Sequence, residues 1–123
     1  MKKMKIGISV GAVVVAGLAM TPTLGAQAAW SDCPSAKVCL WQNNDYSGDF
    51  LGWRSAGGGL LDISPVNDNR TSSWGNRSTT NAAFYQLAGG EGFCVPMPAT
   101  SQNPDLADAF NDKASSWRTN RGC

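Results

Sequence analysis

The sequence predicts an all-β domain, a sandwich of two four-strand units in which each unit covers the apolar face of the other. Short apolar stretches are separated by turn residues at intervals of about 8 to 12 residues, a spacing typical of small β domains. No long amphipathic helical pattern is visible. Segments of the first half recur in the second half at offsets of 43 and 44 residues, which indicates an internal repeat.

The N-terminal segment, residues 1–28, is typical of a bacterial secretory signal peptide. Three lysines lie within residues 2–5, an uncharged run rich in Val, Ala and Gly covers residues 6–20, and Ala26-Gln27-Ala28 supplies the small residues that a signal peptidase needs. The run is shorter than the roughly 20 apolar residues of a membrane span. We therefore place the mature start at Ala29 and expect a secreted, extracellular protein without a membrane anchor.

The charge of the mature chain argues against two classes of partner. Three of the ten basic residues lie in the signal segment and all nine acidic residues lie after it, so residues 29–123 carry a formal charge of −2. Nucleic acids and anionic membranes both require clustered Lys and Arg, and no basic stripe is present. We expect a single monomeric domain over residues 29–123 that binds neither.

The cysteines indicate a disulfide-stapled domain. Four are present, an even number in a chain with an export signal: Cys33, Cys39, Cys94 and Cys123. Three connectivities are possible, and we favour Cys33 with Cys39 and Cys94 with Cys123. Zinc binding is the alternative, but the chain has no histidine and no Cys-x-x-Cys motif.

The expected strands follow the repeat. In the first repeat, residues of about 36–77, they are 38–41, 49–53, 60–63 and 73–74. In the second repeat, about 82–123, they are 82–87, 92–97 and 116–118, while residues 105–110 suit a helical turn as well as a strand. Each repeat also begins with a hairpin that needs a residue with positive φ, for which Gly48 and Gly92 are suited. Gly90 stands where the first hairpin has Tyr46, so we expect the second hairpin to be looser.

The strongest internal match is a pair of polar loops, residues 68–74 and 111–117, each ending in tryptophan. Calcium takes six to eight oxygen ligands from carboxylates, amides, hydroxyls and backbone carbonyls, and both loops offer that set. Each loop has one carboxylate, which implies modest affinity suited to an extracellular medium. A polar turn closed by its own side chains, without a metal, is the alternative interpretation.

Both loops fit the pattern Asn/Asp-Asn/Asp-x-x-Ser/Thr-Ser of the βγ-crystallin superfamily, and Trp41-x-x-x-x-Tyr46-x-Gly48 resembles its hairpin signature. The resemblance implies a Greek-key β-sandwich with two calcium sites, each drawing ligands from both motifs. The implied ligands are the side chains of Asp68, Asn69, Ser72, Asn111, Asp112 and Ser115, and the carbonyls of Arg70 and Lys113. Ser73 and Ser116 look like hydroxyls that fix the loops.

A narrower resemblance concerns function. Residues 33–41, Cys-Pro-Ser-x-x-Val-Cys-Leu-Trp, and residues 111–116 resemble small secreted bacterial proteins of the crystallin-fold peptidase-inhibitor family. This resemblance implies an extracellular protease as partner, of the metalloproteinase class. The matching residues belong to the scaffold and do not locate the inhibitory surface.

Three functions compete. Inhibition would use a rigid loop, and the candidate by its prolines and its disulfide is the segment Pro96, Met97, Pro98, Ala99 and Thr100. The alternative is a calcium-stabilised extracellular module for cell wall, carbohydrate or protein, or an antimicrobial toxin-like protein. We do not expect an enzyme, because the chain has no histidine, one glutamate and no cysteine expected to be free.

Overall fold

A computed structural model describes residues 29–123, and the proposed signal peptide lies outside the described residues. The strands are β1 Lys37–Asn43, β2 Ser47–Ser55, β3 Leu61–Asp62, β4 Ser73–Asn76, β5 Ala82–Leu87, β6 Glu91–Met97, β7 Ser101–Asn103 and β8 Ser116–Arg118. Three short 3₁₀-helices accompany them: η2 Trp30–Asp32, η3 Asn44–Tyr46 and η4 Ala88–Gly90. Within residues 29–123, no helix has the length and apolar character that crossing a membrane would need.

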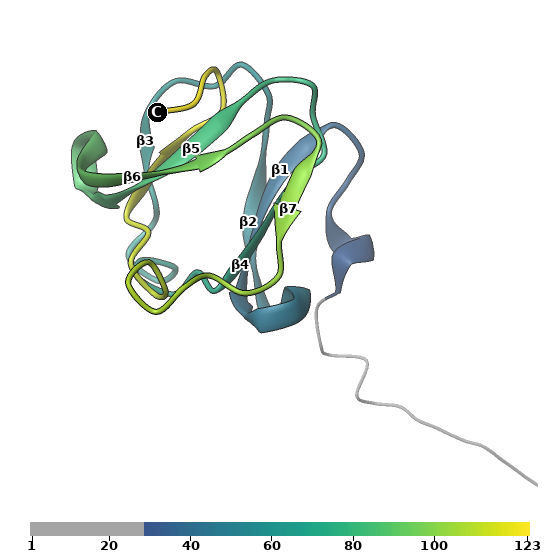
Figure 1. The fold of residues 1–123 in the computed structure, drawn as a ribbon, viewed down its shortest axis with the longest axis horizontal. Helices are drawn as coiled ribbons and strands as arrows, with labels where there is room; N and C mark the ends of the chain where they lie inside the picture. The colour runs from purple at the N-terminus through teal and green to yellow at the C-terminus, as the bar shows by residue number, and fades with distance from the viewer. Residues whose placement is uncertain (1–28) are drawn as a thin grey trace, which may run out of the picture.

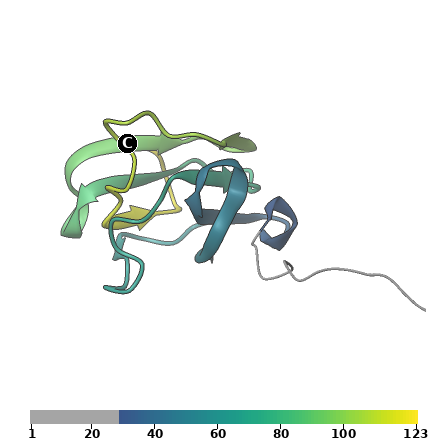
Figure 2. The same cartoon turned by 90° about the horizontal axis from the view of Figure 1, so that it is seen from below.

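The strands form two four-stranded antiparallel sheets, in the orders β2-β1-β4-β7 and β3-β8-β5-β6 (Figure 1; Figure 2). The all-β sandwich is therefore as predicted, but the sheets are not the two repeats. Each sheet takes three strands from one repeat and the third strand of the other, β7 or β3. This exchange hydrogen-bonds the repeats to each other as well as packing them face to face, so neither sheet is complete without both repeats.

The exchanged strand of the second repeat was not expected from the sequence. Strand β7 is polar, Ser101-Gln102-Asn103, and it pairs with β4 at the edge of its sheet. An edge strand with half-exposed polar residues lacks the apolar alternation that reveals other strands. The ambiguous residues 105–110 are not a strand: they end in a turn in which the amides of Phe110 and Asn111 donate to the carbonyl of Ala107.

Strand β1 shows how alternation builds two apolar layers. Val38 and Leu40 point between the sheets into the main core. Cys39 and Trp41 point to the outer face, where Trp41 packs beneath Trp30, Tyr46 and Phe50. The main core comprises Val38, Leu40, Leu51, Trp74, Ala82, Phe84, Val95, Met97, Leu106, Ala114 and Trp117.

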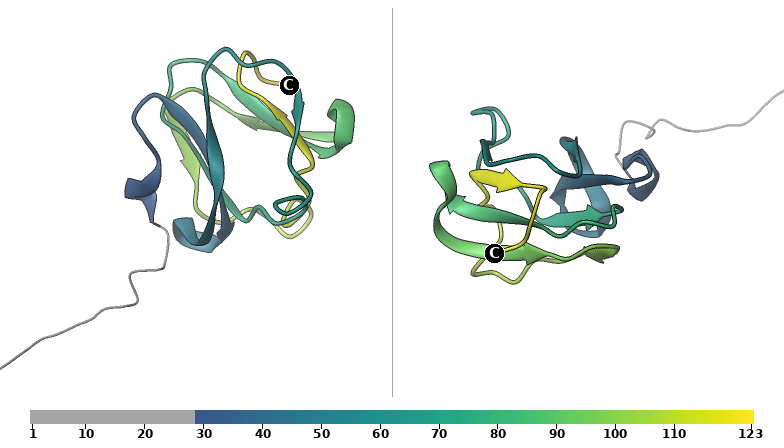
Figure 3. Two further views of the ribbon diagram at one scale, coloured as in Figure 1. Left: turned by 180° about the vertical axis from the view of Figure 1, so that it is seen from behind. Right: turned by 90° about the horizontal axis from the view of Figure 1, so that it is seen from above.

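Both disulfides have the favoured pairing, Cys33 with Cys39 and Cys94 with Cys123. The first holds the N-terminal segment against the outer aromatic layer. The second ties the C-terminus to β6, so the chain end lies against that sheet (Figure 3). No cysteine is free within residues 29–123, which agrees with an oxidising compartment.

Candidate metal centre

The two polar loops lie side by side at one end of the sandwich, the lower end in Figure 1. They are joined by two equivalent backbone hydrogen bonds. The amide of Asn69 donates to the carbonyl of Ala114 at 3.0 Å, and the amide of Asp112 donates to the carbonyl of Thr71 at 2.9 Å. Asn69 and Asp112 both have positive φ, 58° and 57°, a conformation that Asn and Asp adopt more readily than other side chains.

Two side-chain hydrogen bonds also join the loops of the two repeats. The Ser72 hydroxyl donates to Asp112 Oδ1 at 3.2 Å, and the Ser115 hydroxyl donates to Asn69 Oδ1 at 3.2 Å. Each loop therefore places its serine against the second polar residue of the other loop. The result is two oxygen-rich positions, each built from both repeats.

A surface cavity adjoins each position. The first, of about 640 Å³, is lined by Ser72, Arg70 and Asn111 with hairpin residues 42–45 and 47, and we call it the first-loop site. The second, of about 420 Å³, is lined by Ser115 and Lys113 with hairpin residues 86–87, and we call it the second-loop site. Asn69 and Asp112 line both cavities. The structure thus brings the expected ligand residues together in two equivalent groups, with Asp68 in a neighbouring hollow beside Asn69 and Ser115.

Two oxygens in or beside the two sites lack a hydrogen-bond partner: Asn111 lines the first-loop site, and Asp68 lies in the neighbouring hollow. Asp68 Oδ1 and Asn111 Oδ1, the first residues of the two loop motifs, are both buried and unpaired. A buried acceptor without a partner costs about 1–3 kcal/mol. A cation would remove that cost, so the residues present fit an oxygen-liganded ion.

The donor set is selective for a hard cation. Within residues 29–123 no group of three or more His, Cys, Asp or Glu side chains is placed to hold a metal. The oxygens at both sites are instead hydroxyl, amide and backbone oxygens, with one carboxylate in each loop. This composition matches calcium chemistry and differs from the thiolate and imidazole sets that zinc prefers.

The second serine of each motif connects its loop to the hairpin above it. Ser73 donates to the carbonyl of Asn43 at 2.7 Å and accepts from the amide of Tyr46 at 3.1 Å. Ser116 does the same with Leu87, at 2.7 Å, and Gly90, at 2.9 Å. These contacts fit the expected loop-fixing role, and they are made in both repeats although Gly90 replaces the aromatic.

Tyr46 distinguishes the first hairpin. Its ring packs 5.0 Å from Trp41 and 4.9 Å from Trp30, contacts that the second hairpin cannot make with Gly90. Burial raises the pKa of the Tyr46 phenol. The first hairpin is therefore held over its loop by aromatic packing that the second hairpin lacks.

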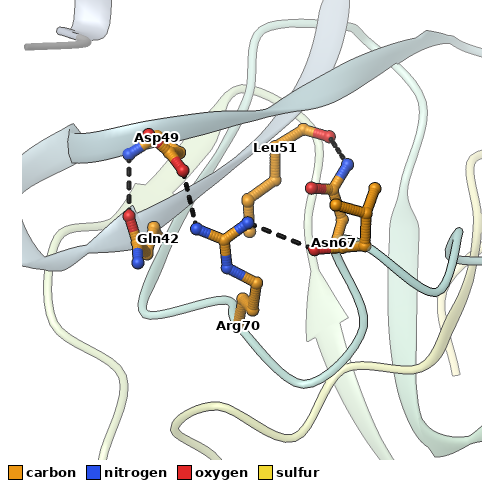
Figure 4. A network of polar contacts seen from close by, with 6 residues as sticks. Gln42, Asp49, Leu51, Asn67 and Arg70 are labelled. Carbon is orange, nitrogen blue, oxygen red and sulfur yellow. Dashed lines mark hydrogen bonds and ion pairs between the residues drawn. The ribbon is translucent and has the colours of Figure 1, made fainter.

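An unexpected polar network holds the first loop to the edge strand β2 (Figure 4). The Arg70 guanidinium pairs with Asp49 Oδ2 at 2.7 Å and donates to the carbonyl of Val66 at 3.2 Å. Asn67 donates to the carbonyl of Leu51 at 3.1 Å. No sequence pattern marks these side chains, and the family resemblance implies a role for the Arg70 carbonyl alone.

The second loop is held differently. Phe93 and Phe110 occupy the positions equivalent to Asp49 and Asn67, at offsets of 44 and 43 residues, and their rings pack at 5.1 Å. Lys113, the counterpart of Arg70, forms no ion pair among the described residues. The first loop is therefore fastened by polar contacts and the second by aromatic packing.

The candidate inhibitory segment is less available than its sequence suggests. Met97 is fully buried in the core, whereas Pro96, paired with Ala83 within β6, keeps its side chain exposed. Only residues 98–100 project as a turn. That turn is anchored, since the amide of Ala99 donates to Asn81 Oδ1 at 3.0 Å and the amide of Thr100 to the carbonyl of Ser78 at 2.9 Å.

Comparison with known proteins gives a family and a fold. The model of peptidase inhibitor family I36 matches residues 26–96. A βγ-crystallin domain from Flavobacterium johnsoniae has a TM-score of 0.56 at 23% identity, covering 66% of this chain and 90% of that one. A βγ-crystallin domain from Clostridium beijerinckii has a TM-score of 0.56 at 20% identity, covering 67% and 94%. A search of curated proteins found no match.

The similar solved structures also include a metal complex. A double mutant of clostrillin in complex with nickel has a TM-score of 0.56 at 20% identity, covering 67% of this chain and 94% of that one. Identities this low show a shared fold alone. The fold is βγ-crystallin-like, as the loop and hairpin motifs implied.

Proposed function

The chain belongs to peptidase inhibitor family I36, and on that premise we propose that it is a secreted, monomeric, calcium-stabilised inhibitor of an extracellular metalloproteinase. Membership of an inhibitor family also means that the chain is not an enzyme. Two disulfides in a domain without free cysteines are consistent with an extracellular location.

One observation carries the calcium proposal: the reciprocal contact of Ser72 with Asp112 and of Ser115 with Asn69. In each pair a hydroxyl and a carboxylate or amide oxygen from different repeats converge on the same position. The first-loop site would use Ser72, Asp112 and the Arg70 carbonyl. The second-loop site would use Ser115, Asn69 and the Lys113 carbonyl.

A bound calcium ion would supply a charged cross-link between the repeats and would take no part in covalent chemistry. The ligand atoms already face each other, so few rotamers would have to be fixed on binding. Asn111 lines the first cavity, where a contact with the ion or with its bound water would relieve the burial of its unpaired oxygen.

The calcium proposal is tested by thermal melts of the mature protein with chelator, with millimolar calcium and with millimolar magnesium. An ion that binds only the folded state raises its stability, by about 2.7 kcal/mol at a hundredfold excess over Kd. For a domain of this size that corresponds to a rise of roughly 10 °C or more. Magnesium should have a smaller effect, because it demands a stricter octahedral geometry. An unchanged midpoint in calcium contradicts the proposal.

The inhibitor proposal rests on the family match, and the metalloproteinase class rests on the resemblance of residues 33–41 and 111–116. Inhibition constants should be measured with the zinc endopeptidase thermolysin and the serine endopeptidase subtilisin. Inhibition of the zinc enzyme supports the proposed class, and inhibition of subtilisin alone reassigns it. A calcium-dependent melt without inhibition of either enzyme would favour the extracellular binding module.

A further inference from the structure

Six large apolar side chains are exposed within the described residues, and three of them lie in or beside one connection between strands. The six are Trp53, Leu60, Leu61, Val66, Leu87 and Phe110. Trp53, Leu60 and Leu61 lie in or beside the connection between β2 and β3, residues 56–60, and that connection crosses the end of the sandwich opposite the polar loops (Figure 1). Single exposed apolar residues are ordinary, but a group of them on one segment indicates a contact surface.

Comparison of the repeats shows that the fold does not require this group. Trp53 pairs with Cys39, and Pro96 pairs with Ala83 at the equivalent place in the second repeat. The connection that follows covers residues 56–60 in the first repeat and only residues 98–100 in the second. The second repeat thus completes the same motif with a shorter turn and without leucines. Leu60 packs over Gly90 of the second hairpin, so the large side chains that the second repeat does without are chiefly those of Trp53 and Leu61, which are about half-exposed.

The connection is held rigidly. Thr119 is fully buried, and its carbonyl and hydroxyl accept from the amides of Gly57, at 2.6 Å, and Gly58, at 2.9 Å. The Arg54 guanidinium donates to the carbonyls of Gly59, at 2.8 Å, and Trp117, at 3.0 Å. A Cβ on Gly58 would lie 2.5 Å from an Arg54 nitrogen and 2.8 Å from the Thr119 hydroxyl, so a larger residue would disturb the contacts that hold the connection. A loop fixed in this way loses little entropy when a partner binds it.

The strand after the connection is open to a partner. β3 lies at the edge of its sheet, pairs with β8 alone, and both of its residues are exposed. A groove of about 260 Å³ separates β3 from β2, with Leu61 and Trp53 among its lining residues and Leu40, Leu51 and Trp117 below. An exposed strand edge offers backbone hydrogen bonds to an extended segment of another protein, and adjacent apolar side chains provide specificity.

We propose that Leu60 and Leu61, with Trp53 beside them, form the surface that contacts the peptidase. The partner is an endopeptidase whose substrate cleft accepts an aliphatic side chain and pairs with the backbone of an extended segment. This assignment rests on the proposed inhibitory function and replaces the turn at residues 98–100, which presents no large apolar side chain. The rigid glycine connection presents the leucines at a fixed position, as an inhibitor requires.

The test compares Leu61→Ser, Leu60→Ser and Pro98→Ala in inhibition assays with thermolysin and subtilisin. If one leucine is buried in an enzyme pocket, its replacement by serine should raise the inhibition constant about tenfold or more. Leu61 is 54% exposed, so Leu61→Ser should keep the melting temperature while it weakens inhibition. Leu60 approaches Gly90, and its substitution serves as the second variant, with its melt recorded in parallel. Pro98→Ala should inhibit like the parent protein.

The outcomes distinguish a failure of the proposed contact surface from a failure of the proposed inhibitory function. Full inhibition by both leucine variants overturns the contact surface, and so does selective loss of inhibition in Pro98→Ala. In either case the inhibitory function itself stands. Failure of the parent protein to inhibit either enzyme removes the proposed function and this inference with it. Weaker inhibition by Leu61→Ser at an unchanged melting temperature supports both.

Discussion

The clearest quantitative prediction concerns the Arg70 side chain, which fastens the first polar loop, a proposed calcium site, to β2. Arg70→Met removes the ion pair with Asp49 and the hydrogen bond to Val66 but leaves the Arg70 carbonyl, the proposed ligand, in the backbone. We expect the first-loop site to bind calcium more weakly, because the loop must then be ordered at the expense of binding energy. The second-loop site should be unaffected.

The size of the effect follows from the exposure of the pair. Asp49 is 70% exposed and Arg70 is 28% exposed. An exposed ion pair contributes about 0.2–1 kcal/mol, and the bond to Val66 adds an amount of similar size. We therefore expect a loss of about 1 kcal/mol, which is roughly a fivefold loss of calcium affinity at one site. The ion-pair part of the loss should shrink at 1 M salt, where the Debye length is about 3 Å.

Calorimetric calcium titration can isolate each site. In Ser115→Ala the first-loop site is the main calcium binder, and in Ser72→Ala it is the second-loop site. The effect of Arg70→Met is therefore measured in the Ser115→Ala protein. Lys113→Met in the Ser72→Ala protein is the matched control, since Lys113 occupies the position equivalent to Arg70 and forms no ion pair among the described residues. Equal losses for the two substitutions would refute the reasoning, as would an unchanged affinity of Arg70→Met at low salt.

Three further predictions follow from the structure. Asp112→Asn keeps an acceptor for Ser72 but removes the carboxylate, so calorimetry should show about tenfold weaker calcium binding at the first-loop site and a smaller loss at the second, whose cavity Asp112 also lines. Loss of the Cys94–Cys123 bridge by double serine substitution should lower the unfolding free energy by about 3–4 kcal/mol, measured by urea denaturation. Gly75→Ala should lower the melting temperature, because its Cβ would lie 2.3 Å from the Trp30 ring.

The sequence predicted those parts of the fold that local pattern determines. Apolar alternation identified most strands, and the repeated loops identified two equivalent positions. The exchange of β3 and β7 between the sheets could not be predicted from strand patterns, because it depends on which partners the strands meet after the chain folds. The βγ-crystallin resemblance implied the shared sites. Strand β7 was missed because its residues are polar.

The polar network at Arg70 and the proposed peptidase surface could not be predicted from the sequence. The Arg70–Asp49 pair joins residues 21 positions apart, and neither has a sequence context that marks it as special. The mostly apolar residues 60–63 predict a strand with one buried face, but the strand in the structure, β3, covers only Leu61 and Asp62. Leu61 is exposed because β3 is short and lies at the sheet edge, and Leu60 lies in the connection before it. Exposure of this kind depends on the position of a strand in the finished sheet.

The exchanged strand connects the proposed calcium site to the proposed peptidase surface. The amide of Ile63, next to β3, donates to the carbonyl of Ser115 at 2.9 Å, and Asp62 accepts from the amide of Gly89 in the second hairpin at 2.7 Å. β3 comes from the first repeat, yet its position is set by the second repeat and by the loop that carries Ser115. An ion at the second-loop site would restrain that loop and, through these two bonds, the strand that presents Leu61. Calcium would therefore act on inhibition through the order of one edge strand, without lying in the contact surface.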